Sequence, residues 1–280
     1  MSNVMLAFIL SLAAGLSTGI GSLITLVAKK QNTNFLAVSL GFSAGVMVYV
    51  SLVELLPEAQ GLLSAVLRNK TGEMAAALSF FAGMVIAGII DKILPEDNNP
   101  HEIRHGHTHE IRYGGPHENR HTTTKTQNTT EKNLMRTGVI TAVAITIHNF
   151  PEGIATFITT MHDPSLALPI VLAIALHNIP EGISVAVPIY YATGDKGKAV
   201  LYSFASGLTE PLGALIGYFI LMPFLNEIVY GVLFAIVAGI MVFISFDELL
   251  PSAREYGEHH LSLYGMVGGM LVMAISLILL

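Results

Sequence analysis

A six-residue pattern, His-Asn-x-Pro-Glu-Gly, occurs twice, at residues 148–153 and 177–182, each time inside a long apolar stretch. On a helix, the His and the Glu of one copy lie four residues apart and share a face, with the Asn on the neighbouring stripe. Imidazole, carboxylate and amide oxygen are ligands that divalent transition metals accept. The two copies together predict one metal site. Its candidate ligands are His148, Asn149, Glu152, His177, Asn178 and Glu181.

The apolar surroundings of the two motifs favour a functional role. An ionisable side chain at the centre of a bilayer costs about 2.5–3.5 kcal/mol on insertion scales, so four of them need a reason. Pro151 and Pro180 also leave the carbonyls of Ile147 and Leu176 without an intrahelical donor. Such carbonyls need partners inside a membrane, which suits a polar cavity. The alternative is two buried His–Glu pairs that only hold helices together.

Two further residues are candidate ligands. Glu210, in the segment Thr209-Glu210-Pro211, is another acidic residue beside a proline in an apolar stretch. It either completes the site or packs against a neighbouring helix through a hydrogen bond. Met47 lies in the middle of another apolar stretch and offers a thioether to a soft metal, although such a Met more often only packs.

The composition indicates that these elements lie in a membrane. Of the 280 residues, 52% are hydrophobic and only 12% are charged, which is too apolar for an ordinary soluble domain. Cysteine is absent, which excludes disulfides, thiolate zinc sites and thiol catalysis. The net charge of −6 argues against nucleic acid as a partner.

Eight apolar runs are long enough to cross a bilayer, for which about 20 residues suffice. They cover roughly residues 4–28, 35–56, 74–94, 137–160, 166–191, 199–222, 228–250 and 261–280. The alternating pattern of a β-barrel is missing from the sequence. We therefore expect an all-α membrane protein with eight transmembrane helices, in one polytopic domain over residues 1–280.

Three pairs of segments indicate an inverted repeat of spans 1–3 in spans 6–8. Residues 43–59 and 237–253 are identical at ten of seventeen positions, and the segment from Ala14 resembles that from Ser206. Spans 3 and 8 share a Gly-Met-Val step, at Gly83 and Gly265. Spans 4 and 5 form a further inverted pair through the doubled motif. Inverted repeats with a midplane site are typical of secondary transporters.

The basic residues predict the orientation. Twelve of the fourteen Lys and Arg residues fall on one side of the eight spans, and only Arg68 and Lys70 on the other. The positive-inside bias places both termini outside and residues 95–135, between spans 3 and 4, in the cytoplasm. We expect this polar segment to be disordered. Its histidines, which either hold zinc loosely or are incidental, are His101, His105, His107, His109, His117 and His121.

Acidic residues mark the ends of two spans on opposite sides of the membrane. They are Glu54 and Glu58 on the outer side, and Asp247 and Glu248 on the cytoplasmic side. Such residues would concentrate cations at an entrance and an exit, or they are helix ends exposed to headgroups. Asp91, at the cytoplasmic end of span 3, could join the exit group or pair with the adjacent Lys92.

The doubled motif, the segment Ser-Gly-Leu-Thr-Glu-Pro at 206–211, the spans and the His-rich loop resemble the ZIP family of divalent metal transporters, especially its bacterial members. The resemblance implies a two-metal centre between spans 4, 5 and 6. It assigns the first metal to His148, Glu152, His177 and Glu181, with Met47 as a further ligand. It assigns the second to Asn149, Asn178 and Glu210, bridged by Glu152 and Glu181. It also implies a cytoplasmic exit site at Asp91, Asp247 and Glu248.

The resemblance further implies a homodimer in the bacterial inner membrane that imports Zn²⁺, and also Fe²⁺, Mn²⁺, Co²⁺ or Cd²⁺, by alternating access. Two other hypotheses remain open from the residues alone. An exporter of the same ions would use the same ligands. An intramembrane metallohydrolase would use the metal to activate water, but the chain lacks His-Glu-x-x-His and a distinct general base. We expect a transporter and not an enzyme.

Overall fold

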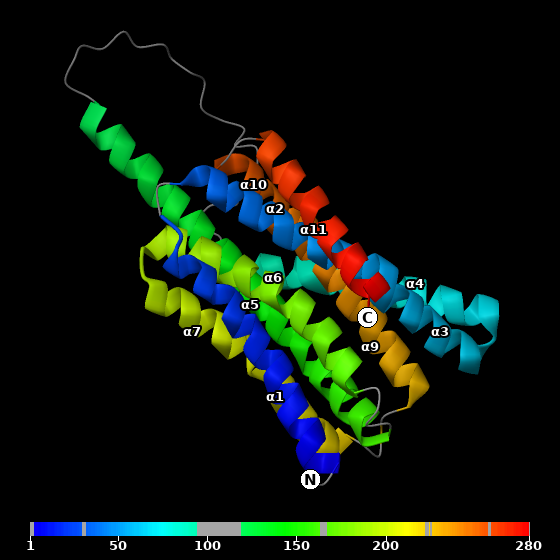
Figure 1. The fold of residues 1–280 in the computed structure, drawn as a ribbon. Coiled ribbons are helices and arrows are strands. Elements are labelled where there is room, and N and C mark those ends of the chain that lie inside the picture. Colours follow the sequence, from blue (N-terminus) through cyan, green and yellow to red (C-terminus); the bar gives the residue numbers. More distant parts are fainter. Residues whose placement is uncertain are drawn as a thin grey trace.

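The computed structural model describes residues 3–29, 32–93, 119–162, 167–221, 224, 226–256 and 259–279, and these residues form a bundle of helices (Figure 1). No strand occurs in these ranges. The α-helices are α1 (Asn3–Ser22), α2 (Thr33–Val50), α3 (Leu56–Leu67), α4 (Asn69–Ile93), α5 (Asn119–His162), α6 (Ala167–Thr193), α7 (Lys196–Gly207), α8 (Thr209–Ile216), α9 (Glu227–Ile244), α10 (Leu250–Tyr256) and α11 (His259–Leu279). One short 3₁₀-helix, η1 (Leu23–Leu26), and three π-helical turns, η2 (Ser51–Leu55), η3 (Gly217–Leu221) and η5 (Ser245–Leu249), complete the described elements.

Six helical segments of the described chain are long and apolar enough to cross a membrane. They are Asn3–Leu26, Thr33–Leu67, Asn69–Lys92, Lys196–Ile220, Glu227–Glu255 and His260–Leu279. They coincide with the predicted spans 1, 2, 3, 6, 7 and 8, which confirms an all-helical protein with several membrane-spanning helices. The predicted spans 4 and 5 fall within α5 and α6, so the total of eight stays a prediction.

The loop predicted between spans 3 and 4 differs in part from the structure. Helix α5 begins at Asn119, inside the segment 95–135. The last part of the predicted loop is therefore helical and continuous with the predicted span 4. Residues 94–118 lie outside the described residues. The same is true of His101, His105, His107, His109 and His117, and only the backbone is described at His121.

The helices pack as two groups that meet along one interface. One group contains α2, α3, α4, α9, α10 and α11, and the other contains α1, α5, α6, α7 and α8. Figure 1 shows α2 beside α11, and α1 beside α5, α6 and α7. The groups touch mainly where α2 packs on α6 and α5 packs on α9. The largest buried apolar cluster spans this contact, with Leu40 and Met47 from one group and Ile145 and Val185 from the other.

The repeat between residues 43–59 and 237–253 is also a structural repeat. At the same place in both copies the α-helix widens into one π-helical turn, η2 after α2 and η5 after α9. Ser51 Oγ donates to the carbonyl of Met47 at 2.6 Å, and Ser245 Oγ donates to that of Met241 at 2.7 Å. A π-turn breaks the regular ladder and is frequent at functional sites. The two copies thus share a deviation from the α-helix as well as their sequence.

Close helix packing corrects one alignment within the repeat. A methyl group at Gly83 would overlap the carbonyl of Ile236, and one at Gly269 would overlap the carbonyl of Phe42. Since Ile236 and Phe42 are equivalent in the seventh and second spans, Gly83 corresponds to Gly269 and not to Gly265. The shared Gly-Met-Val step is misleading because Gly265 and Gly269 lie one helical turn apart on the same face, so either could face the neighbouring helix.

The second group repeats its packing in the same way. A methyl group at Gly153 would overlap the carbonyl of Glu210, and one at Gly182 would overlap the carbonyl of Thr18. Glu210 and Thr18 are equivalent when the segment from Ala14 is aligned with that from Ser206. The alignment of spans 1 and 6 is therefore supported by contacts, and the glycine of each motif allows a neighbouring backbone to approach closely.

The repeated glycine contacts predict a stability difference. Gly45 abuts the carbonyl of Met266, its equivalent Gly239 abuts that of Phe80, and a side chain at Gly61 would meet open space. Gly45→Ala and Gly239→Ala should each lower stability by about 1–3 kcal/mol through overpacking. Gly61→Ala is the control and should leave stability equal or higher, because Ala is the better helix former. Thermal unfolding of the detergent-solubilised protein measures the effect. Equal melting temperatures for all three variants would contradict it.

Candidate metal site

Each motif lies where a helix contains a proline. Pro151 is inside α5 and Pro180 is inside α6, so each helix lacks one backbone hydrogen bond beside its His and Glu. The carbonyl of Pro180 accepts a hydrogen bond from Ser43 Oγ of α2 at 2.8 Å. This bond connects the first helix group directly to the second motif. Each helix therefore has a backbone carbonyl without its intrahelical donor next to its polar motif side chains.

Glu210 is positioned by a break between two helices. Helix α7 ends at Gly207 and α8 begins at Thr209, with a turn at Leu208. Thr209 Oγ1 donates to the carbonyl of Ser206 at 2.5 Å, and Pro211 cannot continue the hydrogen-bond ladder from α7. Irregular backbone inside a membrane protein is tolerated where it lines a site or is buried in protein. The break places Glu210, which is fully buried, in the first turn of α8.

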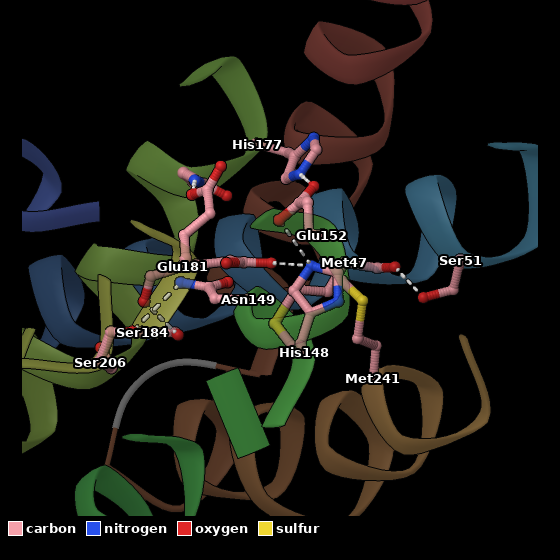
Figure 2. Close-up of polar contacts among 12 residues, drawn as sticks. Met47, Ser51, His148, Asn149, Glu152, His177, Glu181, Ser184, Ser206 and Met241 are labelled. Atoms are coloured by element: carbon pink, nitrogen blue, oxygen red, sulfur yellow. Dashed lines mark hydrogen bonds and ion pairs between the residues drawn. The ribbon is translucent and has the colours of Figure 1, made fainter. Parts of the chain in front are cut away.

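The His and Glu side chains of the two motifs meet across the α5–α6 contact (Figure 2). His177 Nε2 lies 2.7 Å from Glu152 Oε1, and His148 Nε2 lies 3.3 Å from Glu181 Oε1 and 3.5 Å from Glu152 Oε2. The two imidazole rings are 6.2 Å apart at their centroids. One ligand atom each of His148, His177 and Glu181 lie within 4.8 Å of one another. This spacing fits one metal ion between the helices.

The two Asn side chains bond to other helices: Asn178 contacts Glu210, and Asn149 contacts the end of α7. Asn178 Nδ2 donates to Glu210 Oε2 at 3.0 Å and to the carbonyl of Ala14 at 3.1 Å. Asn149 Nδ2 donates to the carbonyl of Ser206 at 3.4 Å. Because each amide nitrogen is held by a carbonyl, each amide oxygen is left available as a ligand.

The strongest sign of a ligand is the number of buried atoms without a hydrogen bond. Fifteen buried side-chain nitrogen and oxygen atoms in the described residues lack a hydrogen bond, and nine belong to the seven predicted ligands. Every one of the seven contributes at least one. They are His148, Asn149, Glu152, His177, Asn178, Glu181 and Glu210. Buried polar atoms are nearly always hydrogen-bonded, so this concentration is what a site for an ion would leave when no ion is bound.

Two buried methionines accompany the site. Met47 and Met241 are 1% and 2% exposed and belong to the same core cluster, and both are drawn with the site in Figure 2. They occupy equivalent positions in the repeat of spans 2 and 7. No described contact joins Met47 to the seven ligands, so its role stays a prediction. The sequence analysis omitted Met241, although the repeat that contains Met47 points to it.

The predicted exit residues come together at the end of the bundle that holds the start of α5. Ligand atoms of Asp91, Asp247 and Glu248 lie within 4.8 Å of one another, although they come from α4 and η5. The ion-pair partner of Asp91 is Arg136 of α5, at 2.6 Å, rather than the adjacent Lys92, which is exposed. Neighbouring residues on a helix point in different directions. Sequence reasoning missed Arg136 because its partners lie far away along the chain.

The predicted entrance residues differ from each other. Glu54, on η2, is partly buried, has an Oε2 without a hydrogen bond, and interacts electrostatically with His177, Glu152 and His148. Glu58, one turn further along on α3, is exposed. The charge of Glu54 therefore acts on the residues of the central site, whereas Glu58 lies at the surface.

Buried nitrogen and oxygen atoms on proline-containing and broken helices of a membrane protein are typical of ion transporters. Residues 2–277 match the family described as ZIP Zinc transporter, and the chain belongs to this family. A zinc transporter ZupT of Streptococcus mutans is 57% identical over 273 residues, which cover 98% of this chain and 97% of the relative. A ZupT of Clostridium perfringens is 57% identical over 285 residues, covering 100% and 97%. One of Oceanobacillus iheyensis is 53% identical over 280 residues, covering 100% of both.

The central site predicts a loss of metal affinity on removal of one carboxylate. Glu152→Gln keeps the size of the side chain but removes a charge that lies beside both histidines. We expect the affinity for Zn²⁺ or Co²⁺ to fall about tenfold or more, equivalent to about 1.4 kcal/mol. Calorimetry on the purified protein measures it, with the exposed Glu73→Gln on α4 as control. Equal affinity of both variants would exclude Glu152 as a ligand.

Proposed function

We propose that the protein imports divalent transition-metal ions, with Zn²⁺ as its main substrate, into the bacterial cytoplasm through the site between α5, α6 and α8. The observation that carries this proposal is the convergence of seven buried donors with unpartnered atoms. The family and the relatives described as zinc transporters support it. Export would use the same ligands, and net metal flux distinguishes the two directions.

The topology that fits this function has eight spans. We add α5 and α6 to the six apolar segments, because both pack along α1 and hold the central ligands between them. The distribution of Lys and Arg supports both termini outside the inner membrane. The family resemblance supports a homodimer of this unit.

Charge balance distinguishes two metal positions within the site. The first consists of His148, Glu152, His177 and Glu181. Two carboxylates there offset one divalent cation, which lowers the cost of burying its charge. The second consists of Asn149, Asn178 and Glu210 and shares the two motif carboxylates. Because its own ligands carry only one carboxylate, the second position should bind a cation more weakly.

The ligand types support a range of metals rather than zinc alone. Only two imidazoles contribute, and the other donors are hard carboxylate and amide oxygens. Such a mixture also suits Fe²⁺, Mn²⁺, Co²⁺ and Cd²⁺. A path for these ions runs from Glu54, beside the central ligands, to the cluster of Asp91, Asp247 and Glu248. Glu58 would attract cations at the outer surface.

Uptake measurements test this function directly. In proteoliposomes, Glu181→Ala should reduce Zn²⁺ uptake at least about tenfold. The variant loses a fully buried carboxylate that pairs with His148 and would bind the metal. The exposed Glu73→Ala should transport as the wild type does. Competition by unlabelled Fe²⁺, Mn²⁺, Co²⁺ and Cd²⁺ defines the range. Unchanged uptake by Glu181→Ala would rule out the central site. Loss of metal from expressing cells would show export instead of import.

The second position predicts the behaviour of Asn178→Asp. The substitution replaces the amide donor to Glu210 by a second carboxylate, so repulsion should destabilise the metal-free protein. A cation bound between the two acids should reverse this effect. We expect a larger rise of the melting temperature with added Zn²⁺ than in the wild type. Asn69→Asp, at an exposed position, is the control. An unchanged metal-induced shift would argue against a cation at this position.

A further inference from the structure

The internal repeat allows the two ends of the path to be compared residue by residue. Glu54 on η2 corresponds to Glu248 on η5, because residues 43–59 align with 237–253. The same alignment places Val53 opposite Asp247. The two ends therefore share one acidic residue, and the end at Glu248 carries a second next to it.

Asp91 and Arg136 also have no charged equivalent. Aligning Gly83 with Gly269 places Leu277 opposite Asp91. Aligning the two motifs places Ser165 of the sequence opposite Arg136. Three acids and one arginine thus align in the sequence with a single acid, Glu54. A function that only one end performs is the simplest reason for this difference.

The Arg136 side chain occupies the oxygens that a cation would need. Its Nη2 lies 2.6 Å from Asp91 Oδ1 and 3.2 Å from the carbonyl oxygen of Asp91, and its Nη1 lies 3.2 Å from Glu248 Oε1. The side chains of Arg136 and Asp91 are only 13% and 14% exposed, so water screens this contact little. Guanidinium–carboxylate hydrogen bonds are among the strong ones in proteins.

The next residue extends the same contact. Thr137 Oγ1 donates to Glu248 Oε2 at 3.1 Å, and it also lies 3.1 Å from Ser252 Oγ. Both oxygens of Glu248 are therefore bonded to α5. Since Asp91 is on α4 and Ser252 is on α10, these bonds join the group of α5 to the other helix group at this end.

We propose that Arg136 is an internal competitor for the transported cation. Its guanidinium holds the carboxylates of Asp91 and Glu248 until a metal ion arrives, and the ion and the guanidinium replace each other. A metal ion and the guanidinium cannot use the same oxygen lone pairs at once. Release of Arg136 and Thr137 also frees α5 from α4 and α10.

The position of Arg136 on α5 connects this exchange to the central site. Arg136 precedes His148 by twelve residues of one continuous helix, or about 18 Å at 1.5 Å per residue. A shift of α5 that follows metal binding at His148 would move Arg136 as well. This inference rests on the proposed transport function, so its tests separate binding at the exit from transport.

The first test measures binding at the exit with the central site disabled. In a Glu152→Gln/Glu181→Gln background, Arg136→Gln should bind Cd²⁺ at the exit about tenfold more tightly, if the competitor occupies the carboxylates about nine-tenths of the time. Lys92→Gln removes an equal charge beside Asp91 and should change nothing. Arg136→Lys keeps the charge without the two-pronged geometry, so its Cd²⁺ affinity should lie between those of the parent and Arg136→Gln. This variant keeps the test valid if Arg136→Gln does not fold. Equal affinities of all these proteins would overturn the proposal.

The second test locks the contact with a disulfide. The chain has no cysteine, so Thr137→Cys/Ser252→Cys introduces a single pair where the hydroxyl oxygens lie 3.1 Å apart. Oxidation with diamide should abolish Zn²⁺ uptake in proteoliposomes, and reduction should restore it. Uptake by the fully cross-linked protein at the wild-type rate would overturn the proposal. Recovery after reduction shows that transport itself is intact, which distinguishes failure of this inference from failure of the proposed function.

Discussion

The structure depends on how four ionisable side chains are accommodated in an apolar bundle. Each of α5 and α6 contributes one histidine and one glutamate, and each histidine contacts the glutamate of the other helix. Such pairing reduces the cost of burying charge, but it leaves carboxylate and imidazole atoms without partners. The pairs hold the two helices together, and the remaining lone pairs are available to a cation. One set of side chains therefore provides both the packing and the site.

Close backbone contacts make this arrangement possible. Gly153 and Gly182 follow the two motif glutamates directly, and each allows the carbonyl of Glu210 or Thr18 to approach. Glu210 and Thr18 are equivalent in the repeat, yet only one is acidic. The Asn178 amide therefore finds a carboxylate partner in Glu210. The difference between these two residues gives a nearly symmetric site a single additional carboxylate.

The helical membrane fold could be predicted from the sequence, and the seven residues predicted as central ligands are all buried in the structure. Both predictions rest on spacing within one helix and on repetition, and the binding of metal by these residues stays a prediction. Arg136 was missed because an ion pair between distant helices leaves no pattern along the chain. The alignment of Gly83 was misplaced because only helix contacts distinguish glycines one turn apart. The start of α5 at Asn119 was missed because its polar composition resembles that of a loop.

The two ends of the bundle show how a repeat can produce unequal ends. Duplication places a π-turn and a glutamate at equivalent points, so Glu54 and Glu248 begin as equals. Their surroundings then differ in kind. Glu54 has an oxygen without a hydrogen bond and interacts electrostatically with the central residues, whereas both oxygens of Glu248 are bonded to α5. An oxygen of Glu54 is thus available to a cation, whereas under the proposal a cation at Glu248 replaces a guanidinium. A few charged residues thus make two ends with equivalent backbones chemically different.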